Sequence, residues 1–409
     1  MREKQKNTIE LRKDSRIKSV PLMKYKKGEN IIIGTYDYNS SFVKTSDLGV
    51  EAIELLNKGH CVGNVQQIMS EKYCKEISIK SLILTLHDAN LISAFDDTQL
   101  YLPKKRSPLA KSALPKISRY LFSKTAYVLY AGICCLAIFC AMYRPILLSN
   151  LGEYLKGHYI QYAILAIFIG WLLTLKHEFF HYLAALSLGV PAHIRLGTRY
   201  FLVVMETDVS GLYMTEKFKR YKVYLAGMIS DLLTIGCLIC IKAFLFLNNI
   251  QTGQAAIFID IVIAFSLFGI LFQFNIFLKT DLYFVLADFI NIENLYTKSD
   301  MVIKSFLRFK APKEREQMSK AVILFSVFRF LNYVILTTIF VLGVAGMILL
   351  FILQIMGVNV RNITNISSEN MPNVSYSLVS TIFYFTIFII AKMHHKRMKQ
   401  RKPIVKILF

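Results

Sequence analysis

Six long apolar runs constrain this chain more than any other feature of its sequence. A stretch of about 20 apolar residues can cross the hydrocarbon core of a bilayer as a helix. The chain has 409 residues and is 54% hydrophobic, more than a soluble protein of this length usually carries. The sequence therefore predicts an α-helical polytopic membrane protein with about six transmembrane helices. The predicted spans are 125–148, 158–188, 221–247, 255–279, 321–356 and 376–392.

Lysine and arginine are distributed unevenly among the loops between these runs. The N-terminal region, the loops at 191–220 and 291–320 and the C-terminal tail are basic, and the remaining loops contain only Lys156 and Arg361. Basic residues concentrate in cytoplasmic loops of membrane proteins. We therefore expect a multi-pass protein of the cell membrane with both termini in the cytoplasm. The net charge of +22 is explained by this topology and by contact with the bilayer.

The composition changes near residue 105, where a basic, proline-containing stretch precedes the first apolar run. Before it, the sequence has the ordinary composition of a soluble domain. We expect five segments: a basic, disordered arm over 1–24, a small α+β domain over 25–102, a linker over 103–124, the transmembrane domain over 125–392, and a basic cytoplasmic tail over 393–409.

The segment 25–102 is expected to form a winged-helix-like α+β domain. β-Favouring residues predict short strands, apolar residues at helical spacing predict three helices, and Asp47 is placed to cap the first helix. The expected order is strands at 31–33 and 42–43, a helix from Asp47 that Gly59 ends, helices over 62–73 and 79–86, and the apolar pair Leu91–Ile92.

His177, Glu178 and His181 form an HExxH motif inside the second apolar run. Residues four apart share one face of a helix, so both imidazoles can reach the same ion. Zn²⁺ accepts two neutral histidines and a carboxylate and leaves a fourth position for water. Glu178 can take a proton from that water as it attacks a carbonyl carbon. The motif therefore predicts a zinc-dependent endopeptidase.

A second class of function fits the same residues. Placing ionisable groups inside a membrane span costs free energy, so such groups usually have a function. A proton relay or a metal-binding transporter would also account for them. A transporter or export factor that binds a metal or proton without hydrolysis is therefore the alternative to a protease. A protease-like scaffold without activity is a third interpretation.

A third metal ligand has to come from another segment. Asp281 and Asp288 follow the fourth apolar run, and Asp260 lies inside it. The loop charges make the second and fourth runs cross in the same direction, from outside to inside. The HExxH motif is in the cytoplasmic half of the second run, and Asp281 follows the cytoplasmic end of the fourth. Asp281 and Asp288 are therefore the candidate ligands, Asp260 is a weaker one, and the site is expected near the cytoplasmic leaflet.

These residues resemble the site-2 protease family of intramembrane zinc metalloproteases. His177–Ala185 follows the family's HExxH helix, and Ala226–Gly227 resembles its Ala-Gly-Pro element, with Met228 in place of Pro. Asn275–Tyr283 resembles the family's Asn-Pro…Asp-Gly segment. The resemblance covers residues 158–295, and its last part fits the branch found with peptide-modification systems.

The resemblance implies that Asp281 is the third zinc ligand and that Asn275 holds or polarises the substrate backbone. Three positions depart from the family pattern: Phe180, Ile276 and Leu282 stand where the family has Gly, Pro and Gly. None of these departures removes a ligand or the base. They concern the shape of the substrate channel, because Gly and Pro set backbone geometry where a peptide approaches.

The N-terminal domain resembles the peptide-recognition domain of pyrroloquinoline quinone biosynthesis. The element order carries this resemblance, with Asp47, the segment Ile53–Gly59 and the pair Leu91–Ile92. It implies that this domain binds the leader of a ribosomally made precursor peptide as an added strand. A winged-helix DNA-binding domain has a similar element order. The predicted helices are not conspicuously basic, so we expect no nucleic-acid partner.

Residues 200–205 predict a strand at the membrane surface, with a turn at Ser210–Gly211. Such a strand suits either the binding of an extended peptide by edge addition or a plain connection. Taken with the metal site, the sequence predicts cleavage of a precursor peptide near the cytoplasmic leaflet. Export or modification proteins are possible partners. Cleavage of a membrane-bound regulator is the alternative substrate.

Overall fold

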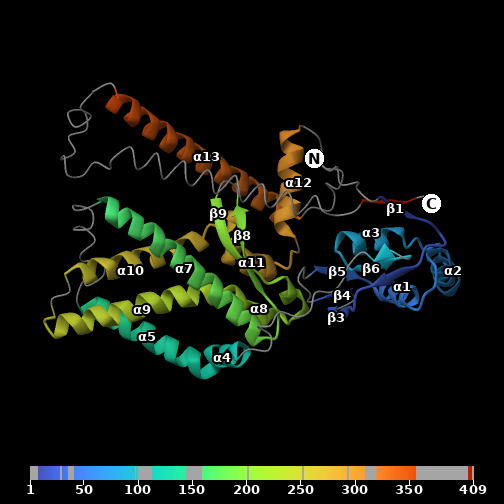
Figure 1. The fold of residues 1–409 in the computed structure, drawn as a ribbon, viewed down its shortest axis with the longest axis horizontal. Helices are drawn as coiled ribbons and strands as arrows, with labels where there is room; N and C mark the ends of the chain where they lie inside the picture. The colour runs from blue at the N-terminus through green and yellow to red at the C-terminus, as the bar shows by residue number, and fades with distance from the viewer. Residues whose placement is uncertain are drawn as a thin grey trace.

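Short strands and three helices form the described part of the first hundred residues, and helices, several of them long, form most of the described remainder (Figure 1). The computed structural model describes residues 8–27, 30–35, 41–96, 98–99, 113–143, 159–199, 202–250, 253–292, 294–308, 319–355 and 404–407.

The N-terminal region forms two small antiparallel sheets and three helices. β4 lies between β3 and β5 in one sheet, and β6 lies between β2 and β7 in the other. Ile33 of β4, Ile53 of α1, Met69 of α2 and Ile83 of α3 are nearly fully buried in one shared core. The elements are β2 (Ile17–Ser19), β3 (Met23–Lys27), β4 (Asn30–Thr35), β5 (Ser41–Thr45), α1 (Asp47–Asn57), α2 (Val62–Tyr73), α3 (Lys80–Asp88), β6 (Ile92–Phe95) and β7 (Thr98–Gln99).

The ends of α1 refine the sequence prediction. The Ser46 hydroxyl, rather than the Asp47 carboxylate, caps the helix by accepting a hydrogen bond from the Gly49 amide (3.4 Å). Asp47 is instead the first helical residue, where its charge favours the helix dipole. Gly59 follows the helix with φ at +96°, a conformation that glycine adopts without strain, and so ends it as expected.

The expectation of a disordered arm over 1–24 is wrong for its second half. Ile17 and Val20 are 2% and 1% exposed, and β2 pairs with β6. These apolar side chains join the core of the N-terminal region, which orders the backbone around them. Further out, β1 (Thr8–Leu11) pairs in parallel with β10 (Ile404–Ile407), so the described ends of the chain lie side by side.

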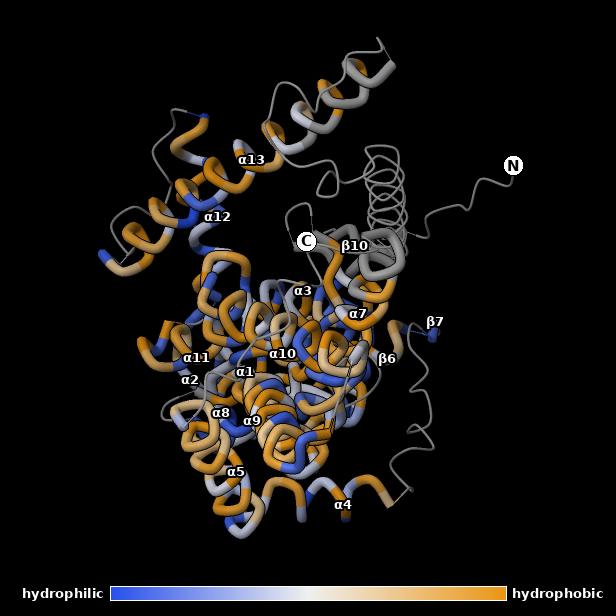
Figure 2. Tube along the Cα trace, turned by 90° about the vertical axis from the view of Figure 1, so that its left-hand side faces the viewer, coloured by the Kyte–Doolittle hydropathy of each residue, from blue (hydrophilic) through white to orange (hydrophobic). Residues whose placement is uncertain are grey.

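Four helices of the described residues are long and apolar enough to cross a membrane. Many of their large apolar side chains are exposed, and Figure 2 shows apolar residues along α5 and α13. Exposure of apolar surface on this scale is typical of helices that contact lipid. The four segments are Lys124–Tyr143 (α5), Ala226–Leu247 (α9), Ala255–Gln273 of α10 (Gln254–Gln273) and Lys320–Gly343 of α13 (Lys320–Ile355).

Two span boundaries differ from the prediction. The third span begins at Ala226 rather than residue 221, because a separate helix rich in Lys and Arg, α8 (Lys217–Tyr224), precedes it. The fourth ends at Gln273, before the 3₁₀ turn η3 (Ile276–Leu278). The second predicted run coincides with α7 (Tyr159–Ser187), and the run over 376–392 lies outside the described residues.

The predicted linker 103–124 contains a short helix. α4 (Leu114–Leu121) has proline in its first turn, a position where the missing amide hydrogen costs nothing. It packs against α7, and Ser118 is completely buried in that contact region. Residues 103–112 lie outside the described part of the chain.

A β-hairpin and several short helices join the spans. The predicted strand over 200–205 is displaced to β9 (Leu202–Asp208), and β8 (His193–Arg199), which sequence reasoning missed, pairs with it. The expected turn at Ser210–Gly211 is the 3₁₀ helix η2 (Ser210–Met214). α11 (Asp281–Phe289) and α12 (Leu295–Leu307) follow the fourth span (Figure 1).

Candidate metal centre

Helix α7 carries the HExxH motif in its buried C-terminal half. His177, Glu178 and His181 are 6%, 9% and 6% exposed, whereas the large apolar side chains earlier in the helix are mostly exposed. The two imidazoles are one helical turn apart and their ring centroids are separated by 4.9 Å. The helix therefore presents both histidines on its buried face, as their spacing predicts.

The first residue of α11 places Asp281 opposite these histidines. The Thr280 hydroxyl donates to the Gln273 carbonyl oxygen (2.7 Å), and the Asp281 amide donates to the Gln273 side-chain oxygen (3.0 Å). These bonds join the end of α10 to the start of α11. They hold the Asp281 carboxylate where the helix dipole favours negative charge.

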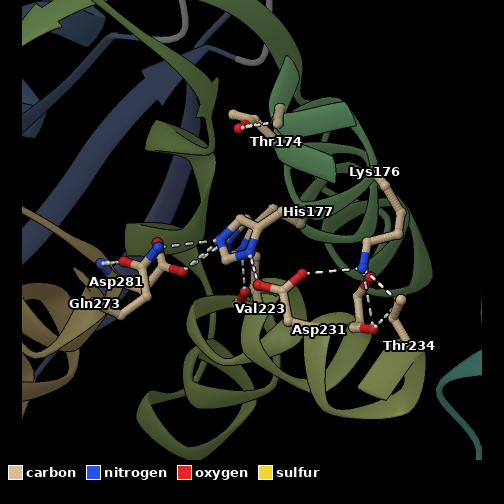
Figure 3. Close-up of polar contacts among 11 residues, drawn as sticks. Thr174, Lys176, His177, Val223, Asp231, Thr234, Gln273 and Asp281 are labelled. Carbon is tan, nitrogen blue, oxygen red and sulfur yellow. Dashed lines mark hydrogen bonds and ion pairs between the residues drawn. The ribbon is translucent and has the colours of Figure 1, made fainter. Parts of the chain in front are cut away.

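Three ligand atoms converge between α7 and α11 (Figure 3). Asp281 Oδ2 lies 3.0 Å from His177 Nε2 and 3.0 Å from His181 Nε2, and the two nitrogens are 3.2 Å apart. Ligands bound at zinc distances in a tetrahedron are separated by about 3.3 Å. The arrangement therefore matches three corners of a tetrahedral zinc site.

Hydrogen bonds on the opposite ring nitrogens orient both imidazoles. His177 Nδ1 donates to Asp231 Oδ2 (2.7 Å), and His181 Nδ1 donates to the Val223 carbonyl oxygen (2.7 Å). A carbonyl oxygen and a carboxylate accept these bonds, so each Nδ1 carries a proton. In the neutral form that binds a metal, each ring then offers the lone pair of its Nε2 atom on the side that faces the Asp281 carboxylate. A single cation between them satisfies all three, so this donor set fits a metal ion.

Burial and charge act in opposite directions on Asp281. Burial alone raises the pKa of this carboxyl group, but the neighbouring His181 and His177 side chains outweigh it and lower the pKa well below its ordinary value. Asp281 is therefore ionised at neutral pH, which is the form that ligates a metal.

Close contact between α9 and α7 depends on Gly227. A β-carbon at this position would lie 2.3 Å from His177 Nε2, a distance that real contacts do not reach. Gly227 therefore leaves the space that the metal-facing edge of the imidazole occupies. Sequence reasoning noted Ala226–Gly227 only for its family resemblance, and the packing supplies its physical reason.

The β-hairpin contacts the expected general base. The Thr207 hydroxyl of β9 lies 2.7 Å from Glu178 Oε2 and 2.8 Å from the Glu178 carbonyl oxygen. This contact ties the Glu178 carboxylate to a strand outside the helices. Sequence reasoning missed Thr207, because the contact joins residues that are 29 positions apart and no local pattern marks it.

The other two candidate ligands form ion pairs elsewhere. Asp288 accepts two hydrogen bonds from Arg220 Nη1 (2.9 and 3.2 Å), and Arg220 is 2% exposed. Asp260 is completely buried and pairs with Lys242 across α9 and α10. Neither carboxylate joins the cluster that could hold a metal, so of the three aspartates considered only Asp281 does.

Asn275 lies just before η3, between the fourth span and Asp281. Its side-chain oxygen is buried and has no hydrogen-bond partner among the described residues. A buried polar atom without a partner is energetically unfavourable, which marks a place where a ligand group can donate. This is compatible with the substrate-binding role expected for Asn275.

Two further polar residues surround the centre and were missed by sequence reasoning. The Gln273 side chain contacts two residues of the centre. Its amide nitrogen lies 3.4 Å from His177 Nε2, and its oxygen accepts the hydrogen bond from the Asp281 amide. Asp231 lies inside an apolar span, and a charged residue in a span is itself a signal of function. That signal was present in the sequence and could have identified Asp231.

No protein-family model, curated protein or solved structure matches this chain.

Proposed function

We propose that this chain is a zinc-dependent membrane endopeptidase, with His177, His181 and Asp281 as the metal ligands and Glu178 as the general base. The observation that carries the proposal is the convergence of three ligand atoms within about one zinc coordination sphere, two of them from the helix that also carries the buried Glu178. The spacing of two ligands around a glutamate suits metal-assisted hydrolysis of a carbonyl compound.

Different residues of the chain would have different roles in peptide hydrolysis. When bound, zinc would polarise the scissile carbonyl and lower the pKa of water toward about 7. Glu178 accepts a proton from the attacking water and returns it to the nitrogen of the leaving amine. Thr207 holds the Glu178 carboxylate during this exchange. The buried amide oxygen of Asn275, which has no hydrogen-bond partner among the described residues, would accept a hydrogen bond from the substrate backbone.

The proposed topology has six spans with both termini in the cytoplasm. The four apolar helices supply four spans, α7 is the second, and residues 376–392 are the sixth. The pairing of β1 with β10 supports an even number of crossings, because it brings the two ends of the chain together. The metal centre then lies toward the cytoplasmic leaflet.

The proposed substrate is a ribosomally made precursor peptide whose leader docks on the N-terminal region. A groove of about 330 Å³ runs beside β5, the outer strand of its sheet, and is lined by Val43, Leu48, Met69, Ile77 and Leu82 among others. Such a groove beside a strand suits a peptide that adds to the sheet. A site-2-type protease acting on a membrane-bound regulator would use the same metal centre and would not need this groove.

A chain of contacts between the N-terminal sheet and the hairpin also supports a precursor peptide. The turn η2 packs against β4 and β5, and η2 directly follows β9, which carries Thr207. The segment 207–214 therefore contacts the N-terminal sheet through η2 and the expected general base, Glu178, through Thr207. A peptide docked beside β5 would begin its path near this segment (Figure 1).

Substitution Glu178→Gln tests the proposal, because it removes the base and leaves both histidines in place. The purified full chain is placed in lipid nanodiscs with zinc and a defined mixture of internally quenched peptides. We expect the variant to retain stoichiometric zinc while cleavage falls by about 10²–10⁴-fold. Glu216→Gln, which changes an exposed carboxylate just before α8, is the control and keeps the activity. Cleavage by Glu178→Gln at the unmodified rate would refute peptide hydrolysis at this centre.

A non-hydrolytic transporter is the second candidate, favoured by one observation. Lys242 and Asp260 form a buried ion pair between two spans, and hydrolysis has no use for it. Paired ionisable residues inside spans are typical of proton pathways. If this alternative holds, Glu178→Gln leaves metal binding unchanged and Asp260→Asn abolishes a zinc flux into sealed vesicles.

A further inference from the structure

A second carboxylate lies behind the three ligand atoms, on the far side of the His177 ring. Asp231 of α9 is 3% exposed and its Oδ2 accepts a hydrogen bond from His177 Nδ1 at 2.7 Å. Its other oxygen, Oδ1, lies 3.0 Å from the ammonium nitrogen of Lys176. Asp231 therefore uses one oxygen for the imidazole and the other for a cation (Figure 3).

Lys176 is held in turn by three acceptors on one helix. Besides Asp231, its ammonium group donates to the Thr234 hydroxyl (2.6 Å) and the Ser230 carbonyl oxygen (3.3 Å). An ammonium group has three N–H donors, and α9 provides an acceptor for each. The orientation of the Lys176 side chain is therefore specified, and it in turn specifies which oxygen of Asp231 faces His177.

The two histidines are supported in different ways. The partner of His181 is the neutral backbone carbonyl of Val223, which no side-chain substitution removes. The partner of His177 is an ionised carboxylate. A carboxylate behind a metal-ligating imidazole fixes the tautomer, orients the ring and makes the ligating nitrogen more basic.

We propose that Lys176 and Asp231 form a positioning pair that holds His177 as a metal ligand. The pair acts through His177 and does not touch the reacting atoms. This inference rests on the proposed function in so far as it takes the centre to bind zinc. It goes further by assigning to α9 the support of a ligand on α7, and by making His177 the ligand that depends on a charged partner.

The chain contains a matched control for this proposal. Lys242 and Asp260 are also a buried lysine–aspartate pair that involves α9, and neither residue belongs to the described cluster that could hold a metal. Replacing a buried ion pair by apolar residues of similar volume is usually tolerated, whereas removing one partner leaves an unpaired buried charge. Both pairs are therefore replaced together, as Lys176→Met with Asp231→Leu, and as Lys242→Met with Asp260→Leu.

Zinc affinity of the full-length protein in lipid nanodiscs is measured by competition with a chromophoric chelator, and cobalt substitution reports the ligand geometry. We expect the Lys176→Met, Asp231→Leu protein to lose about 10–100-fold in zinc affinity and to change its cobalt d–d spectrum. The Lys242→Met, Asp260→Leu protein is expected to match the unmodified protein in both measurements. Asp231→Asn, which retains an acceptor without the charge, is expected to fall between these limits.

The outcomes separate this inference from the proposed function. Unchanged zinc affinity in the Lys176→Met, Asp231→Leu protein, or an equal loss in the control protein, overturns the positioning pair and leaves the peptidase intact. A Glu178→Gln protein that cleaves at the unmodified rate overturns peptide hydrolysis at this centre and leaves the positioning pair standing. An unmodified protein that binds no zinc overturns both.

Discussion

At the scale of single residues, the candidate centre depends on small residues that leave space for the ligands as well as on the residues that would bind the metal. Gly227 contributes no atom to the cluster, yet any larger residue would occupy the position of His177 Nε2. Thr207 and Asp231 contribute single oxygen atoms that hold the base and one ligand. Interiors are close-packed, so displacement of an imidazole by a fraction of an ångström is transmitted directly to the ligand geometry.

Substitution Gly227→Ala is therefore expected to abolish zinc binding, because the new methyl group would overlap the His177 ring. Alanine favours a helix over glycine by about 0.5–1 kcal/mol, so the helix itself is not the source of the loss. Metal analysis of the purified protein measures the zinc content, and circular dichroism checks the helical content. Gly132→Ala in α5, where a new β-carbon meets nothing within 4 Å, is the control. A Gly227→Ala protein with full zinc content would contradict the steric argument.

At the scale of elements, α11 matters because its first residue is a proposed ligand and its last turn is anchored. Asp288, seven residues after Asp281, pairs with Arg220 of α8. Tyr283 is 4% exposed and accepts a hydrogen bond at its hydroxyl from the Tyr296 amide (2.9 Å). The helix is therefore held on two sides, and its N-terminus is directed at α7.

Substitution Asp288→Ala is expected to lower stability without removing the metal. It leaves Arg220 buried and unpaired, which costs about 3–5 kcal/mol. Thermal unfolding in nanodiscs measures the loss, and zinc content is measured alongside it at low temperature. The exposed pair Lys219–Glu216 gives the comparison, since Glu216→Ala is expected to cost at most about 1 kcal/mol. Loss of zinc with unchanged unfolding would instead make Asp288 a ligand.

Local patterns predicted the elements better than their contacts. The helix over 62–73 was predicted at the residues where α2 lies, and Gly59 ends α1, because spacing and backbone preference are local properties. The order of the runs left both Asp281 and Asp288 as candidates, and only the family resemblance favoured Asp281. In contrast, the pairing of β2 with β6 and the contact between Asp231 and His177 join distant segments. Such contacts come from tertiary packing, which no window of sequence contains.

At the scale of the whole molecule, the N-terminal region and the metal centre are connected through η2, which packs against β4 and β5. A precursor peptide docked beside β5 would hold its cleavage site close to Glu178. Docking makes the second contact intramolecular, so the local concentration of the scissile segment rises to the millimolar range for a short spacer.

Removal of the leader is therefore expected to raise KM by about 10²-fold or more and to leave kcat nearly unchanged. Two synthetic peptides with the same cleavage site, one with the leader and one without it, are compared on the full chain in nanodiscs. Leu82→Asp, which places a charge in the groove beside β5, is expected to raise KM for the longer peptide alone. Equal KM values for both peptides would favour a substrate that does not use the N-terminal region.

The separation of the ligands along the chain has a consequence for biogenesis. His177 and Asp281 are 104 residues apart, so the ribosome completes α7 long before α11 exists. During that interval the nascent chain holds two histidines without their third ligand. With the proposed ligand set, stable zinc loading would be a late event in synthesis and could not precede insertion of the α9–α10 helical hairpin. An immature chain would then lack the proposed peptidase activity toward its neighbours.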